Sequence, residues 1–326
     1  MQEYGETLKI ISKWLPVNYI HTDNDINNFL KDTLDMDFSP YLDAFMERID
    51  AVDYEFNDNS LVSGFVCFIG SVLMSLLQQG SVDKLDDLFT FSSCYMLMDH
   101  YLDDKDIDKK EKSKLIADIA SLMVLKDESK ISSPIIKLVA KKYLSMIKNN
   151  PQAKKQFNHL FKAEVKCFKL QSKDNLSEKE YMRIAEWKGG ATCTTIQSLL
   201  ELPITNHELL LGAVIQLVDD MIDLDEDLES GIHTIATFHI KEYESLEPLF
   251  IQTIRRIGEM SCKYNFFKPI LVLGAMFGIY NHSEWVSDDI LIAIDPYIPY
   301  KPTTTKEKMK SRFIRLLKER SDIYDL

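Results

Sequence analysis

Apolar side chains recur at helical spacing along almost the whole chain, and this periodicity restricts the fold more than any other feature. Apolar residues three or four positions apart form one face of an α-helix, whereas strands need strict alternation. The ten prolines fall between the periodic segments or near their ends, where helices tolerate them. No hairpin signal interrupts the pattern. The sequence therefore predicts an all-α fold.

Helices are expected over residues 23–34, 40–51, 60–79, 82–104, 109–125, 134–148, 153–171, 178–200, 206–229, 246–263, 269–280 and 306–320. No linker rich in Pro, Gly or Ser and no repeat of fixed period divides them. We therefore predict one α-helical domain over residues 1–326. The first 50 residues are the only segment that we would set apart, as a peripheral helical piece.

Local signals bound the helix that is expected at 206–229. Thr205 and Glu208 have the spacing of a capping box, in which two side chains satisfy free backbone N–H groups at a helix start. Gly231 suits the left-handed conformation that follows a last helical turn. The helix is therefore expected to begin after Thr205 and to stop before Gly231.

Charge and cysteine usage exclude several classes of protein. The chain has 38 Lys and Arg against 51 Asp and Glu, a formal charge of −13, which disfavours nucleic acid and anionic membranes and favours cations as partners. Five scattered cysteines without a C-x-x-C pair predict neither a disulfide framework nor a structural zinc site. With no signal-peptide layout at the N-terminus, a reducing cytoplasm fits best. The uncharged run 59–82 is diluted by Ser, Gly and Gln, so we expect a buried helix and no stable membrane span.

The stretch 216–233 holds seven carboxylates and no Lys or Arg. Asp219, Asp223 and Asp227 are four residues apart and would fall along one ridge of a helix, where like charges repel by a few tenths of a kcal/mol per pair. An apolar stripe is expected on the opposite side, formed by Leu210, Val214, Leu217, Met221 and Leu228. Two interpretations remain open. The ridge is either a solvated acidic face or a cation site, and the absence of interspersed basic residues favours the cation site.

A second acidic cluster lies at the C-terminal end of the helix expected at 82–104. Asp99 and Asp103 fall on the apolar stripe of that helix, and buried carboxylates need a cation or a water-filled cavity. Carboxylates with few His nearby suit Mg²⁺, which typically bridges one or two carboxylates to substrate phosphates. If the two clusters face each other across a bundle cavity, they predict metal-assisted departure of a phosphate group.

These motifs resemble the class I isoprenoid synthase superfamily. "DHYLDD" from Asp99 resembles the first aspartate-rich motif, and Asp219, Asp223 and Asp227 resemble the second, although terpene cyclases have Asn or Asp, Ser or Thr, and Glu there. "GAVIQLVDDMID" is also similar to trans-prenyltransferases, and the repeated D-x-x-x-D spacing to squalene and phytoene synthases. The resemblance implies a helical bundle with a central apolar cavity. It also implies that five aspartates are catalytic ligands of three Mg²⁺ ions that bind a prenyl diphosphate: Asp99, Asp103, Asp219, Asp223 and Asp227.

Departures from the family patterns favour one branch. "DDKDIDKK" stands where elongating prenyltransferases carry Arg-Arg-Gly, and no Gly-Lys and Arg site for isopentenyl diphosphate precedes Asp99. We therefore expect a terpene synthase that ionises an allylic prenyl diphosphate, cyclises or rearranges the carbocation and releases diphosphate. A prenyltransferase, of the polyprenyl diphosphate synthase or squalene and phytoene synthase type, and a noncatalytic helical binding or regulatory relative remain alternatives. A homodimer is compatible with each.

The resemblance also suggests a diphosphate-binding segment. Arg183 and Lys188 match the family in position and residue type, on a helix that we expect Gly189 and Gly190 to interrupt. The alternative is a surface Arg and Lys beside two glycines that serve packing.

Overall fold

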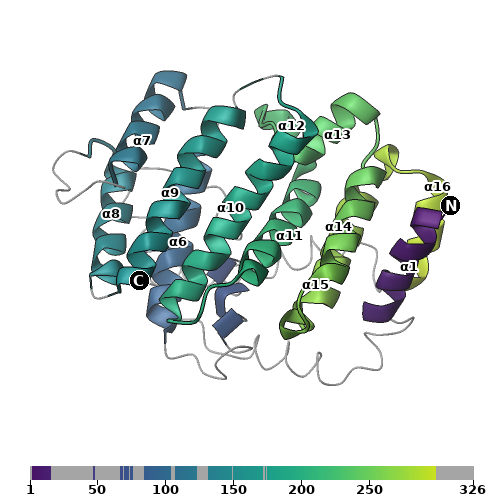
Figure 1. Ribbon diagram of the computed structural model, residues 1–326. Coiled ribbons are helices and arrows are strands. Elements are labelled where there is room, and N and C mark those ends of the chain that lie inside the picture. The colour runs from purple at the N-terminus through teal and green to yellow at the C-terminus, as the bar shows by residue number, and fades with distance from the viewer. Residues whose placement is uncertain are drawn as a thin grey trace, which may run out of the picture. The chain divides into compact units, whose positions relative to one another are not determined.

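The computed structural model describes residues 2–15, 47, 67–68, 70–72, 74–75, 84–103, 107–122, 131–148, 150–171, 173 and 175–298. Every regular element in these ranges is a helix, and they contain no strand (Figure 1). This confirms the all-α class. The central apolar cavity and the isoprenoid synthase type of bundle stay predictions.

The α-helices are α1 Gln2–Trp14, α6 Leu85–Asp103, α7 Lys109–Leu122, α8 Pro134–Ile147, α9 Pro151–Gln171, α10 Glu178–Leu199, α11 Asn206–Ile222, α12 Leu224–Ser230, α13 Ile235–Tyr243, α14 Glu247–Glu259, α15 Phe267–Asn281 and α16 Asp288–Ile294. Short 3₁₀ turns are η2 Cys262–Tyr264, η3 Ser283–Trp285 and η4 Asp295–Tyr297. The helices expected at 23–34 and 306–320, nearly all of 40–51 and most of 60–79 lie outside the described residues.

Three helices were not anticipated: α1, α13 and α16. The start of α13 explains why it escaped notice. Its capping box pairs Thr234 with Thr237, so the Glu or Gln that normally marks such a box in a sequence is absent. The other two predicted signals are confirmed. Thr205 and Glu208 form the capping box of α11, and Gly231 ends α12 with φ of 66° and ψ of 28°.

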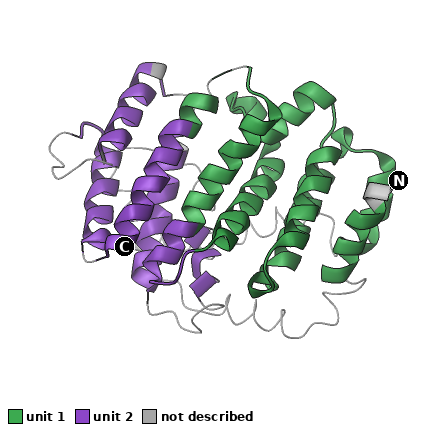
Figure 2. Ribbon diagram, in the orientation of Figure 1, with its two compact units in different colours: residues 1–36, 167–193, 205–306 green, residues 37–166, 194–204, 307–326 purple. Residues whose placement is uncertain are grey.

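Contacts divide the chain into two compact units (Figure 2). Unit 1 comprises residues 1–36, 167–193 and 205–306, and unit 2 comprises residues 37–166, 194–204 and 307–326. The single domain over residues 1–326 stays a prediction.

Unit 1 is organised around α11, which packs against α13, α14 and α15. Leu211, Val214, Leu217 and Met221 of α11 are completely buried. Removing a side chain of this size from water stabilises the fold by roughly 1.5–3 kcal/mol. The N-terminal helix α1 packs on α14 and α15, so it belongs to the core of this unit.

Unit 2 has an aromatic core where α6 packs against α8. The ring of Phe91 stacks on Tyr95 and Tyr143 at centroid distances of 5.8 and 6.1 Å and meets Phe157 edge-on at 5.8 Å. The Tyr143 hydroxyl donates to the carbonyl of Phe91 at 3.3 Å, and burial raises its pKa well above the usual value. These rings therefore pack as core. None of the helices in the described part of the chain is both long and apolar enough to cross a membrane.

Candidate functional site

The acidic stretch is divided between two helices. The chain leaves α11 after Ile222, Asp223 has φ of −95° and ψ of 12°, and α12 begins at Leu224. The prediction of one continuous helix over 206–229 was therefore wrong at Asp223. Carboxylates near a helix C-terminus face the negative end of the macrodipole and repel each other four residues apart, which favours ending α11 there. The same change of direction leaves Leu228, expected on the apolar stripe, 47% exposed.

Asp219, Asp223 and Asp227 nevertheless keep helical spacing across this junction. The amide of Asp223 donates to the carbonyl of Asp219 at 2.9 Å, and the amide of Asp227 donates to the carbonyl of Asp223 at 2.9 Å. These bonds have the i to i−4 pattern of an α-helix, so each aspartate follows the previous one by about one turn. Asp219 is exposed, and the other two are half-buried. Three carboxylates thus follow one another at helical spacing, partly open to solvent.

Asp220 is the most buried carboxylate of this group, with 7% of its surface exposed. Burial raises its pKa to about 7, although the hydrogen bond from Gln216 opposes this rise; the negative charge of Asp219 adds to it, and the positive charge of Lys188 reduces it. Gln216 Nε2 donates to Asp220 Oδ1 at 2.9 Å and to Asp219 Oδ2 at 3.2 Å. Asp220 was not among the predicted site residues. Its position three residues after Leu217, a stripe residue, was the signal that it faces inward.

The segment predicted to bind diphosphate lies on α10, which runs unbroken through Gly189 and Gly190. The expected interruption was therefore wrong. A Cβ atom on Gly189 would lie 2.0 Å from the carbonyl oxygen of Gly212, so glycine is needed here for the backbones of α10 and α11 to touch. Arg183 is exposed on this helix, and Lys188 is half-buried. Of the two, Lys188 acts electrostatically on the carboxylates of α11, since it lowers the pKa of Asp220.

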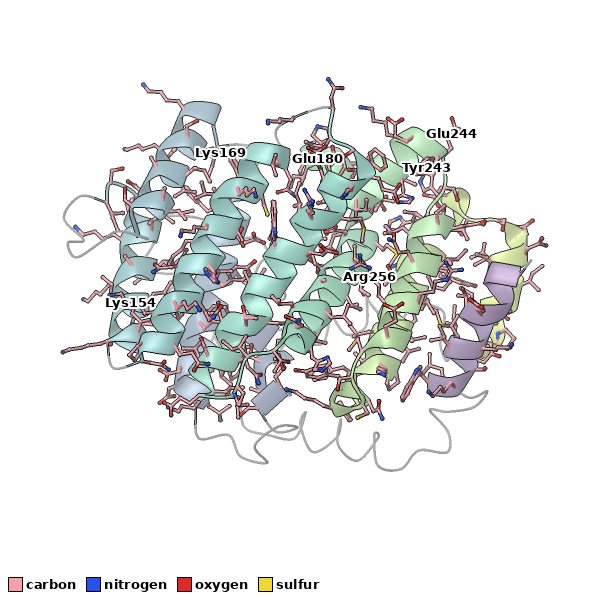
Figure 3. All side chains as sticks on the ribbon, in the orientation of Figure 1. Lys154, Lys169, Glu180, Tyr243, Glu244 and Arg256 are labelled. Carbon is pink, nitrogen blue, oxygen red and sulfur yellow. The ribbon has the colours of Figure 1, made fainter. Side chains whose placement is uncertain are left out.

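A further ion pair fixes α10 within unit 1. Nη2 of Arg256 on α14 (Figure 3) lies 3.0 Å from Oε1 of Glu186 on α10. With the glycine contact, it holds α10 to α11 on one side and to α14 on the other. The helix that carries Lys188 is therefore well fixed.

The first acidic motif belongs to unit 2. Asp99 is half-buried near the end of α6, and Asp103 is the last residue of that helix. The stripe predicted for this helix comprises Leu85, Leu88, Phe89, Tyr95, Met96 and Leu102; all are buried except Leu85 and Met96, which are half-buried. Because the units are described separately, a site that joins this motif to the aspartates of unit 1 stays a prediction.

An open hollow lies along α9 in unit 2, lined by Pro151, Lys154, Lys155, Asn158, His159 and Lys162. Its lining is basic and contains none of the predicted site residues, so it differs in character from the apolar cavity that the sequence predicts.

Comparison with known proteins gave no match: no protein family, no curated protein and no solved structure resembles the chain significantly. The proposals below therefore rest on the residues themselves and their geometry.

Proposed function

We propose that this chain is a Mg²⁺-dependent enzyme that ionises an allylic prenyl diphosphate and releases diphosphate, as class I terpene synthases do. The observation that carries the proposal is the spacing of Asp219, Asp223 and Asp227, which backbone hydrogen bonds preserve across the junction of α11 and α12. A solvated acidic face could have the same spacing, but it would normally be interspersed with Lys or Arg, and 216–233 contains neither.

The donor set fits Mg²⁺. All three side chains offer carboxylate oxygens, the hard ligands that this ion prefers, and none is fully buried. The stretch 216–233 that carries them contains seven carboxylates and no Lys or Arg, so the sequence around them supplies no balancing positive charge. When bound, Mg²⁺ would act as a Lewis acid toward phosphate oxygens.

The chain's own residues have distinct tasks in this proposal. Asp219, Asp223 and Asp227 hold the metal, while Gln216 fixes the orientation of Asp219 through its hydrogen bond of 3.2 Å. Lys188 and Arg183 attract the diphosphate. The allylic C–O bond breaks with its electron pair leaving on the diphosphate, and the carbocation cyclises, rearranges or loses a proton. No protein nucleophile is required. The roles of Asp99 and Asp103 as further metal ligands stay predictions.

The test is release of diphosphate from geranyl, farnesyl and geranylgeranyl diphosphate with Mg²⁺, each with and without isopentenyl diphosphate. We expect release without the co-substrate, a hydrocarbon or alcohol product, and loss of at least about 100-fold in rate for Asp99→Ala and Asp223→Ala. Glu229→Gln is the matched control, because this exposed acid near the end of α12 has no part in the proposed site.

Other outcomes would lead to other functions. Turnover only with isopentenyl diphosphate would identify a chain-elongating synthase, and joining of two prenyl units would identify the squalene and phytoene synthase type. If the folded protein releases no diphosphate from any of these substrates, the catalytic proposal fails. The noncatalytic binding relative would then be the better description.

A further inference from the structure

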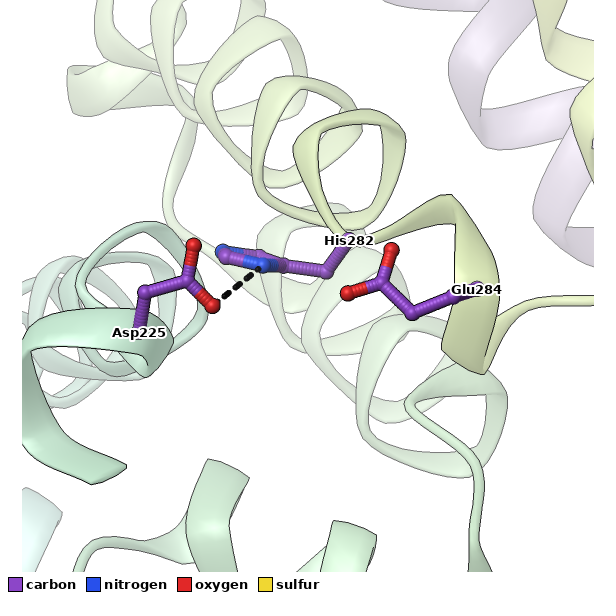
Figure 4. A group of neighbouring side chains, drawn as sticks. All are labelled: Asp225, His282 and Glu284. Carbon is purple, nitrogen blue, oxygen red and sulfur yellow. Dashed lines mark ion pairs between the residues drawn. The ribbon is translucent and has the colours of Figure 1, made fainter. Parts of the chain in front are cut away.

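Three potential metal ligands, none of them a member of the aspartate triad, converge from separate elements of unit 1 (Figure 4). Asp225 lies in the first turn of α12, His282 directly follows α15, and Glu284 lies in η3. One ligand atom from each side chain lies within 4.8 Å of the other two. Asp225 and Glu284 are exposed, whereas His282 is 2% exposed.

The imidazole of His282 is oriented for a ligand. Its Nε2 lies 3.4 Å from the carbonyl oxygen of Ile222, a contact in which the ring N–H donates. In the neutral ring this leaves the lone pair on Nδ1, which is buried and makes no hydrogen bond. A protonated ring would instead form an ion pair with Asp225 through the same atom. A backbone carbonyl that accepts from one ring nitrogen while the other binds metal is the usual arrangement of metal-ligating histidines.

The Nδ1 atom faces a carboxylate. Oδ1 of Asp225 lies 3.5 Å from it, as Figure 4 shows. Two ligand atoms of a tetrahedral zinc ion are roughly 3.4 Å apart, given bonds of about 2.0–2.2 Å. The two atoms are therefore already spaced as neighbouring ligands of such an ion. The exposed side chains of Asp225 and Glu284 can turn toward it without disturbing the core.

We propose that Asp225, His282 and Glu284 form a binding site for a single divalent ion of the zinc class. One imidazole nitrogen with two carboxylate oxygens is a donor set that suits Zn²⁺ better than Mg²⁺, which prefers oxygen ligands alone. Water would complete the coordination. The site is independent of the proposed function, since it shares no residue with Asp219, Asp223 and Asp227. A bound ion would tie α12 to the end of α15.

The test is titration of the metal-stripped full-length protein with Zn²⁺ in competition with a chromophoric chelator. We expect one Zn²⁺ per chain that excess Mg²⁺ does not displace. The affinity should fall by at least about 10-fold in His282→Ala and in Asp225→Asn, because each removes one ligand. His207→Ala, an exposed histidine at the start of α11, and Glu229→Gln should bind as the unchanged protein does.

Asp225→Asn decides the matter if His282→Ala does not fold, since Asp225 is exposed and its replacement leaves the buried ring in place. Absence of Zn²⁺ binding, or equal binding by the unchanged protein and the folded variants of His282 and Asp225, would overturn the proposal. Asp223→Ala separates this site from the proposed active site. It should abolish diphosphate release and leave the Zn²⁺ affinity unchanged.

Discussion

Each end of α11 carries a buried carboxylate, and the pKa values of these two groups shift in opposite directions. Glu208, in the first turn, is completely buried and accepts hydrogen bonds from Lys263 at 2.6 Å, from Tyr264, and from the amide and hydroxyl of Thr205 at 2.6 and 2.7 Å. Burial would raise its pKa, but these donors outweigh burial and lower it to about 2. At the other end burial prevails, and the pKa of Asp220 rises to about 7.

The difference lies in what surrounds each carboxylate. Glu208 stands at the positive end of the helix dipole, and the segment 263–264 brings a cation and a hydroxyl to it. Asp220 stands near the negative end beside Asp219, and the donors that lower its pKa do not offset burial. The first end is a completed structural site. At the second, burial favours the neutral form of the carboxyl.

The largest effect on stability that this comparison predicts follows removal of the hydrogen-bonded carboxylate of Glu208. Glu208→Ala should lower the free energy of unfolding by roughly 3–5 kcal/mol, because it leaves Lys263 and Tyr264 without their partner and removes half of the capping box. Urea denaturation followed by circular dichroism measures this. Glu229→Ala, an exposed acid, should change stability by less than about 0.5 kcal/mol. A loss equally small at Glu208 would refute the contrast between the two ends.

Replacing Asp220, whose pKa is raised by burial, should increase the free energy of unfolding. Asp220→Asn should raise the free energy of unfolding by roughly 2–4 kcal/mol at pH 8 in EDTA, since each pKa unit corresponds to about 1.4 kcal/mol. The folded pKa of about 7 lies above the ordinary value of 3.8. In the unchanged protein, the contribution of Asp220 to the free energy of unfolding is therefore fully present below pH 4. It is lost progressively as pH rises to 7.

The gain from Asp220→Asn should follow the same profile. It should be absent at pH 4 and complete above pH 7. Denaturation curves at several pH values test this, and a gain that does not depend on pH would show that Asp220 is not held neutral by burial.

Acid denaturation probes the other end of α11. The folded pKa of Glu208 is about 2, against an ordinary value of 4.5, so its contribution is present above pH 4.5 and is lost as pH falls toward 2. We expect this contribution to be about 2 kcal/mol, because Lys263 is 36% exposed and water screens its charge. Glu208→Gln should flatten this part of the stability profile. If stability still falls as steeply between pH 4.5 and pH 2 in this variant, other carboxylates control acid denaturation.

The smallest effect concerns the donor at the acidic end. Gln216→Met removes the hydrogen bonds to Asp219 and Asp220, so the pKa of Asp220 should rise further and stability at pH 8 should fall by about 1 kcal/mol. A double-mutant cycle with Asp220→Asn measures how much of this loss runs through Asp220. Full additivity would place the role of Gln216 elsewhere.

Much of this chain could be predicted from local sequence. The all-α class followed from apolar periodicity, and the start of α11 and the stop at Gly231 followed from side-chain chemistry at helix ends. Such features depend on residues within a turn or two of each other, so the sequence contains all the information that decides them. The helical spacing of Asp219, Asp223 and Asp227 could also be predicted from the sequence.

Only the tertiary structure decided which carboxylates are satisfied, that α11 ends at Ile222 and that α10 continues through Gly189 and Gly190. Two partners of Glu208 come from residues 263 and 264, and Gly212 on another helix explains Gly189. The potential ligands around His282 come from three elements. Burial and pairing depend on which distant segments meet, and the energies involved exceed local preferences. Sequence alone therefore located the acidic helix, and packing determined which of its carboxylates are buried.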